Sequence, residues 1–248
     1  TAMNAIANSQ TAMNAIANSQ TAMNAIANSQ TAMNAIANSQ TAMNAIANSQ
    51  TAMNAIINSQ TALNAVINSQ TAMNAVINSQ TALNAVFSNT TARNTFINST
   101  ALTRKEIPQM TSNTTPEGTA SASSVYGSGY EAFKAFDKNT SVHWTSASDA
   151  ITNQWLRYSF VSDVFIHTVQ IHPPPNSTSP RNCIIQCSQD GTNWINVANI
   201  TVQNTAQQQT FYVARSGYYK HWRLFMSDNY GAADMAIYEL NFIGFVKP

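Results

Sequence analysis

The sequence predicts two architectures in one chain, an α-helical shaft built from short repeats and an all-β sandwich head. The first hundred residues repeat a ten-residue unit, and this unit does not alternate polar and apolar residues as a half-buried strand would. The later residues change to short alternating segments with turn signals between them. The predicted domains are a shaft at 1–107, a linker at 108–118 and a head at 119–248.

The repeat unit Thr-Ala-Met-Asn-Ala-Ile-Ala-Asn-Ser-Gln occurs unchanged up to Gln50 and then drifts conservatively. Its large apolar residues, Met3 and Ile6 in the first copy, are three positions apart, and the next Met follows seven positions later. If ten residues close three helical turns, these side chains form a narrow seam on one side of a helix. A narrow apolar seam is typical of a coiled coil, so we predict a continuous decad-repeat helix that winds around other copies.

A single helix of this kind would gain too little free energy from its own seam. Ordering ten residues costs on the order of 10–20 kcal/mol, whereas burying Met and Ile returns only about 3–6 kcal/mol. Partner chains must then supply the missing burial, and analogy with fibres makes a parallel homotrimer the predicted assembly, with two or four strands left open. Two less favoured alternatives are a single-chain β-solenoid with five-residue steps and a Thr-bearing ice-binding helix.

Composition and charge exclude several functional classes. Charged residues make up 8% of the 248 residues, and the formal net charge is +1. All Lys and Arg lie at or after Arg93 without forming a basic cluster, which argues against nucleic acid or an anionic membrane as a partner. No apolar run reaches the roughly 18 residues of a membrane-spanning helix. Because the chain starts at Thr1 among identical repeats, we expect it to be a window onto a longer protein.

The end of the shaft is marked by a proline. Ile107-Pro108 is expected to end the helix, because the residue before proline disfavours the α conformation. The stretch at 111–118 is rich in Thr, Ser and Asn and contains Pro and Gly, a composition that is typical of a linker.

The head shows the alternation of half-buried strands. Leu156, Tyr158 and Phe160 are predicted to share a buried face, and the same pattern recurs in later segments. The two cysteines are four positions apart on one predicted strand, about 13 Å, which is beyond disulfide reach. Core positions are therefore expected for both cysteines and for three of the tryptophans: Cys183, Cys187, Trp155, Trp194 and Trp222.

Six sequence pieces in order carry a family resemblance across the head. They are Thr119–Ser124, Ala135–Asp137 with Trp144, Trp155-Leu156, Ser188–Trp194, Tyr219–Leu224 and Tyr238–Gly244. With these pieces residues 119–248 resemble the discoidin, or coagulation factor 5/8 type C, family. The resemblance implies an eight-stranded jelly-roll sandwich, and it implies carbohydrate recognition, because bacterial members are galactose-binding-like modules.

The same resemblance implies a structural calcium ion. The family often holds it with the Asp matched by Asp137 and the Glu matched by Glu239. Two departures weaken this expectation, because Val142 replaces a Thr of the family and Lys138 replaces its Gly, whereas calcium prefers six to eight oxygen ligands. The two carboxylates have an alternative role as loop caps, and no other cofactor is predicted.

The candidate sugar site lies in the loops of the head. Sugars are bound by aromatic rings together with side chains that hydrogen-bond hydroxyl groups, and loops at one end of a sandwich usually carry such residues. The predicted contacts are Tyr126, Tyr130, His143, Arg181, Asn182 and Tyr230. No catalytic residue is predicted, because nucleophile-elbow, phosphate-loop and zinc-protease motifs are absent and the acidic residues are scattered.

The whole chain looks like a bacteriophage tail, whisker or head fibre. That resemblance implies a location on the virion surface or outside the cell, and attachment to a host-cell glycan. Several weak heads on one shaft would raise the apparent affinity by about 10²–10⁴-fold. Two other interpretations stay open: a structural fibre whose head caps or trimerises the shaft without binding sugar, and a bacterial surface adhesin of the same build.

Overall fold

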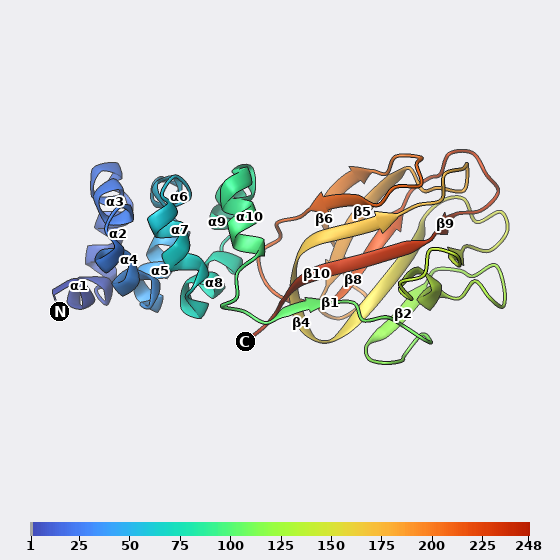
Figure 1. Ribbon diagram of the computed structural model, residues 1–248, viewed down its shortest axis with the longest axis horizontal. Helices are drawn as coiled ribbons and strands as arrows, with labels where there is room; N and C mark the ends of the chain where they lie inside the picture. The colour runs from blue at the N-terminus through green and yellow to red at the C-terminus, as the bar shows by residue number, and fades with distance from the viewer. Residues whose placement is uncertain (1) are drawn as a thin grey trace. The chain divides into compact units, whose positions relative to one another are not determined.

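The computed structural model describes residues 2–248, which divide into two compact units (Figure 1). The first is the repeat region up to Arg104, and the second contains Lys105–Val213 and Tyr218–Lys247.

The repeat region forms ten short helices within residues 2–97 instead of one long helix (Figure 1). Their bounds are α1 Ala2–Ala7, α2 Gln10–Ala17, α3 Gln20–Ala27, α4 Gln30–Ala37, α5 Gln40–Ala47, α6 Gln50–Ile57, α7 Gln60–Ile67, α8 Gln70–Ile77, α9 Gln80–Ser88 and α10 Thr90–Ile97. The prediction of helical repeats is confirmed, and the prediction of a continuous coiled-coil helix is wrong.

The Asn-Ser pair of each repeat explains the breaks. Ser49 is the N-cap of α6, in an extended conformation, and its side chain accepts a hydrogen bond from the Ala52 N–H at 3.2 Å. Asn58 is the C-cap of the same helix. Ser and Asn side chains compete for backbone groups and favour helix ends over helix interiors. Asn and Ser therefore end one helix and start the next once in every ten residues, and the Met/Ile seam alone does not reveal these breaks.

The helices pack against one another with a period of three repeats. Contacts join α2 to α5, α3 to α6, α4 to α7 and α5 to α8, so three helices make one turn of a single-chain α-solenoid. Met13, Met23 and Met33 are fully buried within this one chain. The apolar seam is therefore covered without partner chains from Met33 to Val86, whereas Ile6 is exposed, and this burial removes the argument for a homotrimer. The trimer itself stays a prediction. The β-solenoid alternative correctly predicted a single-chain solenoid, but the solenoid is built from helices and not from strands.

The head is built from ten strands and one 3₁₀ helix within residues 104–246. The strands are β1 Arg104–Glu106, β2 Thr119–Ala122, β3 Trp144–Thr145, β4 Gln154–His172, β5 Asn182–Ser188, β6 Ile195–Thr201, β7 Gln209–Tyr212, β8 Tyr219–Met226, β9 Ala236–Ile237 and β10 Glu239–Val246, and the 3₁₀ helix is Ala132–Ala135.

The long strand β4 organises an antiparallel sandwich. The main sheet has the order β1-β10-β4-β8-β5-β6, and β2 and β7 also pair with β4 (Figure 1). Residues 154–159 of β4 pair with β8 and contain the segment that pairs with β2, whereas residues 164–172 pair with β10 and contain the segment that pairs with β7. A register shift between Ser159 and Val164 separates the two halves. The predicted β-sandwich is confirmed.

The buried residues of the strands follow the predicted alternation, but two of the three tryptophans predicted for the core do not lie there. Leu156, Tyr158 and Phe160 are buried, and both cysteines are buried free thiols. Trp222 is buried as predicted. Trp155 and Trp194 are only half-buried, so their core assignment is wrong. Trp155 lies next to the inward-facing Leu156, and alternation therefore turns it to the opposite face of β4.

The segment predicted as a linker, 108–118, is folded against the sandwich. Met110 is buried, and its N–H donates to the Phe136 carbonyl oxygen at 3.0 Å. The Tyr158 hydroxyl donates to the Glu117 carbonyl oxygen at 2.5 Å. The helix expected to run to 107 already ends at Ile97. The prediction of a linker at 108–118 is therefore wrong. Met110 contributes to the core of the sandwich, although the polar composition of the segment is typical of a linker.

Candidate functional site

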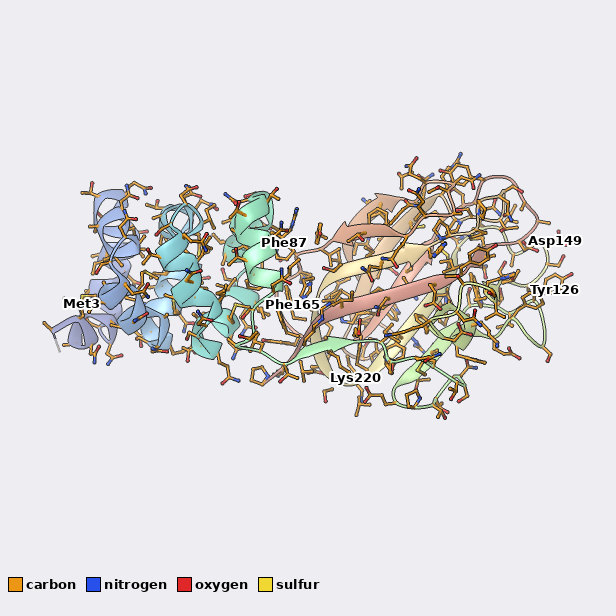
Figure 2. All side chains as sticks on the ribbon, viewed as in Figure 1. Met3, Phe87, Tyr126, Asp149, Phe165 and Lys220 are labelled. Carbon is orange, nitrogen blue, oxygen red and sulfur yellow. The ribbon has the colours of Figure 1, made fainter. Side chains whose placement is uncertain are left out.

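Three predicted sugar contacts line one pocket at the loop end of the sandwich. Its volume is about 270 Å³. The lining residues are Tyr126, Tyr130, His143, Thr145, Pro174, Asn176, Thr178, Asp234, Ala236 and Tyr238. Figure 2 shows Tyr126 among the loops at this end of the head, which also carries Asp149. Clustering of loop residues at one end was the basis of the prediction, and it brings these three together.

Backbone hydrogen bonds hold the loops of the pocket in place. The Tyr126 N–H donates to the Thr145 carbonyl oxygen at 2.9 Å, and the Ala236 N–H donates to the Thr178 carbonyl oxygen at 3.0 Å. Strand β3, which begins one residue after His143, pairs with β9 through Trp144 and Thr145. The pocket is thus fixed by the short sheet β3–β9 and by loops tied to it.

A chain of aromatic rings forms one wall of the pocket. The ring centroids of Tyr126 and Tyr130 are 5.6 Å apart, those of Tyr130 and His143 are 5.4 Å apart, and those of His143 and Tyr238 are 5.4 Å apart. His172 continues the chain at 5.7 Å from Tyr238. The Tyr126 side chain is 56% exposed, which leaves ring surface open to solvent at the rim. Such rings offer flat apolar surface beside polar tips.

Polar atoms complete the lining. Burial lowers the pKa of His143, and the charge of Asp234 partly opposes this effect. The imidazole is therefore neutral at pH 7, with one donor and one acceptor nitrogen. The buried Thr145 hydroxyl has no hydrogen-bond partner within residues 2–248. Asn176 Oδ1 accepts bonds from the N–H and the hydroxyl of Thr178, at 2.9 and 2.6 Å.

The other three predicted contacts form a separate cluster around Asp228. Arg181 donates to Asp228 Oδ2 at 2.7 Å, and the Asn182 side-chain amide donates to the same oxygen at 2.9 Å. The Arg181 hydrogen bond is the main reason that the pKa of Asp228 falls to about 2. The Tyr230 hydroxyl donates to the Val202 carbonyl oxygen at 2.9 Å. These side chains satisfy one another and hold the loop after β8 to the start of β5.

The two carboxylates that the resemblance assigns to calcium lie together. The Asn139 N–H is shared between Asp137 Oδ1 at 3.0 Å and Glu239 Oε1 at 2.9 Å. Burial, together with the nearby Asp137, raises the pKa of Glu239 to about 8 although the Asn139 N–H opposes the shift. Lys138 turns toward Glu106, with Nζ 3.6 Å from Oε1.

This carboxylate pair fits calcium in the chemistry of its donors. Both side chains offer hard oxygen atoms, and a divalent cation in place of the retained proton would balance their two charges. The pair also performs the capping role, since both members accept the Asn139 N–H. Within residues 2–248 no third His, Cys, Asp or Glu joins a metal-binding group, so further ligands would come from backbone oxygen atoms and water.

Three of the ten lining residues were predicted from the sequence, and the other seven were not. Tyr238 lies in a bend between β9 and β10 and is half-buried, whereas Leu240 and Phe242 of β10 are buried. Asn176, Thr178 and Asp234 gave no signal, because isolated polar residues in loops are common. The bend turns Tyr238 toward the pocket, and the sequence pattern did not predict this bend.

No helix among residues 2–248 combines the length and apolar character needed to cross a bilayer.

Comparisons with known proteins found one matching family and several similar solved structures. The F5/8 type C domain family matches residues 119–229. The family 32 carbohydrate-binding module of Clostridium perfringens NanJ, solved with galactose, is 20% identical, covers 56% of this chain and 98% of its own, and has a TM-score of 0.48. Chitosan-binding module 1 from a chitosanase/glucanase of Paenibacillus sp. IK-5 is 24% identical, covers 54% of this chain and 99% of its own, and has a TM-score of 0.46. No curated protein sequence matches the chain. The discoidin resemblance noted in the sequence is confirmed for residues 119–229, which form an F5/8 type C domain.

Proposed function

We propose that the head is a carbohydrate-binding module and that the pocket beside Tyr130, His143 and Tyr238 is its sugar site. The observation that carries this proposal is the aromatic wall that faces polar atoms in one loop-end pocket of an F5/8 type C domain. Family membership supports the class of ligand, because the family resemblance implies carbohydrate recognition.

The lining matches the two faces of a sugar ring. Tyrosine rings stack on the C–H face of a pyranose, while neutral His143, Asp234 and the Asn176 amide bind hydroxyl groups. The Thr145 hydroxyl, which lacks a partner within residues 2–248, gains one when a ligand hydroxyl enters. A volume of about 270 Å³ lies near the lower end of ligand pockets, ~300–1,000 Å³, and suits one terminal sugar unit.

A glycan array probed with the full chain tests this proposal. Binding to a defined set of glycans is expected, and Tyr130→Ala and His143→Ala should remove it while the circular dichroism spectrum stays unchanged. Tyr212→Ala is the matched control, since Tyr212 is an exposed tyrosine on β7 outside the pocket. Silence of the native chain across the array, or equal loss in the control, would overturn the proposal.

The proposed role of Asp137 and Glu239 is to hold a structural calcium ion that braces the loop at 137–142. Their shared N–H partner and the raised pKa of Glu239 support it, because a buried carboxyl pair gains from a cation. The ion would stabilise the fold and would take no part in chemistry.

We also propose that the chain belongs to a virion fibre that attaches to a host-cell glycan, with a homotrimer as its assembly. A helical array that lengthens by ten-residue steps is suited to setting the distance between a binding module and a surface. Immunogold labelling of virus particles with an antibody against the full chain should mark projecting fibres, and sedimentation should give three chains. Labelling of bacterial envelopes alone would contradict the virion location.

A further inference from the structure

Two arginines lie side by side on the outer face of the sheet β2-β4-β8-β5. Arg157 on β4 pairs in register with Arg223 on β8, and this face points away from the core because the neighbouring Leu156 and Leu224 are buried. Ser121 on β2 extends the row beyond Arg157, and Gln186 on β5 extends it beyond Arg223. The four strands lie next to one another in the sheet (Figure 1). A polar row thus crosses four strands.

The row holds both guanidinium groups in fixed orientations. Arg157 Nε donates to Ser121 Oγ at 2.8 Å, and Arg223 Nε donates to Gln186 Oε1 at 2.6 Å. These bonds use Nε of each guanidinium, and the two terminal nitrogens of such a group can bind a carboxylate end-on through two parallel hydrogen bonds. The arrangement is therefore preorganised for an anion.

Two positive charges lie opposite each other on neighbouring strands of this face. Like charges placed opposite each other on neighbouring strands are destabilising. Within residues 2–248 no carboxylate forms an ion pair with Arg157 or Arg223. The nearby carboxylate of Asp190 accepts bonds from the N–H groups of Thr192 and Asn193 instead. Burial, followed by the charge of Arg157, lowers the pKa of Arg223 to about 10.

Aromatic rings flank the arginines on the same face. Trp155 pairs in register with Phe225, one row away from the arginine pair. The Trp155 ring centre lies 5.4 Å from the Arg157 guanidinium carbon and 5.8 Å from that of Arg223. Trp194 stacks closely on Arg223, at 3.9 Å. Both tryptophans are half-buried, so ring surface remains open to solvent. These are the two tryptophans that the sequence analysis had placed in the core.

We propose that this arginine face, formed by Ser121, Trp155, Arg157, Gln186, Arg223 and Phe225, is a second binding site and that it takes an acidic polysaccharide. The acidic group of one sugar unit is held by the two guanidinium groups, and the apolar face of a sugar ring packs on Trp155. The rest of the chain favours this ligand over nucleic acid, since its formal net charge of +1 and scattered basic residues give no extended phosphate-binding track. The site shares no residue with the loop-end pocket and does not depend on it.

Affinity electrophoresis of the full chain in native gels tests the proposal. Gels that contain polygalacturonate provide a carboxylate, gels that contain dextran sulfate provide a sulfate, and gels that contain neutral dextran are the blank. The native chain should be retarded by one or both acidic polymers and not by dextran, and added salt should reduce the retardation. Arg157→Gln and Arg223→Gln should each weaken binding about tenfold or more, because a charge-assisted contact is lost. The arm that responds identifies the acidic group.

Three further variants keep the proposal falsifiable. Lys220→Gln removes one positive charge from the same strand without touching the row, and it should change binding by less than about threefold. Arg223→Lys keeps the charge but loses the planar fork, so it should still weaken binding while its folding is checked by circular dichroism. His143→Ala should leave the acidic site intact. Absence of retardation, equal effects of Lys220→Gln and Arg223→Gln, loss in His143→Ala, or stronger retardation by single-stranded DNA would each overturn the proposal.

Discussion

The side-chain hydroxyl of Ser69 donates a hydrogen bond to the backbone carbonyl oxygen of Ala37, 32 positions earlier, at 2.6 Å. Ser69 also caps its own helix by accepting the Ala72 N–H at 3.2 Å. One side chain therefore both starts a helix and joins it to the preceding turn of the solenoid. The same 32-residue bond recurs from Ser39 to Ala7, Ser49 to Ala17, Ser59 to Ala27, Ser79 to Ala47 and Ser99 to Ile67.

Ser69→Ala should destabilise the repeat unit by about 1–3 kcal/mol, because the variant loses a helix cap and leaves the buried Ala37 carbonyl oxygen without this donor. Asn89→Ala is the matched control. Asn89 caps α10 through the Ala92 N–H at 2.9 Å, and within residues 2–248 its side chain makes no bond to the repeat 32 positions before it. Urea unfolding followed by far-ultraviolet circular dichroism should show the larger loss for Ser69→Ala. Equal losses would mean that the turn-to-turn bond contributes nothing.

The repeat region shows what the sequence could and could not predict. The period predicted a helix and a seam of Met and Ile, and both are present in the structure. The geometry of the whole depended on Asn8 and Ser9, whose cap-forming ability decides between one long helix and many short ones. The helix propensities of Asn and Ser do not show where each helix ends. The ends are set by side-chain to backbone hydrogen bonds, which cap each helix and also join it to the preceding turn.

The head was more predictable because alternation fixes which residues face inward. Leu156 and Tyr158 are buried as predicted, and the same rule, applied strictly, would have placed Trp155 outside. Strand pairing between distant parts of the sequence decides which of the predicted sugar contacts share a pocket. Loop residues such as His143 and Arg181 are equally polar in the sequence, and only the pairing of β3 with β9 places His143 in the pocket.

Gly244→Ala should destabilise the head by about 3 kcal/mol or more, as expected of overpacking against backbone. A Cβ at this position would lie 1.8 Å from the Phe165 carbonyl oxygen, at the register shift between Ile243 and Gly244 in the β10–β4 pair. Gly127→Ala is the control, since a Cβ there meets nothing within 4 Å. Thermal unfolding monitored by tryptophan fluorescence should show a large loss for the first variant only. A melting temperature unchanged by Gly244→Ala would contradict this close strand packing.

Calcium should stabilise the native head and not the Asp137→Asn variant. At a calcium concentration about a hundredfold above the dissociation constant, the gain is about 2.7 kcal/mol. Differential scanning calorimetry of the full chain with calcium or with a chelator measures it. Asp149→Asn is the control, since Asp149 lies on another loop with φ of 63°, a conformation that Asn tolerates. If calcium stabilised Asp137→Asn as much as the native chain, Asp137 would not be a calcium ligand.

Tyr238→Ala should weaken glycan binding with little effect on stability, whereas Tyr230→Ala should lower stability with little effect on binding. Tyr238 lines the pocket, so its loss should weaken glycan binding about tenfold with little effect on stability. The Tyr230 hydroxyl is bonded to the Val202 carbonyl oxygen outside the pocket, so its loss should cost about 1 kcal/mol of stability. Titration calorimetry with a glycan identified on the array, paired with thermal unfolding, separates the two. If Tyr230→Ala lost glycan binding but kept its stability, the sugar site would also include the cluster around Arg181.

His143 should titrate below the ordinary histidine value of 6.5, since burial lowers its pKa. The unfolded chain then binds the proton more readily, so this group costs stability as the pH falls below 6.5 and costs nothing above it. The charge of Asp234 opposes the shift, and Asp234→Asn should therefore lower the pKa of His143 further. Proton-carbon NMR spectra recorded across pH would follow the imidazole signals of the chain's 4 histidines, and the signal missing in His143→Gln identifies the residue. A pKa above 6.5, or one that rises in Asp234→Asn, would show that the ring is solvated and is not the neutral imidazole on which the sugar site depends.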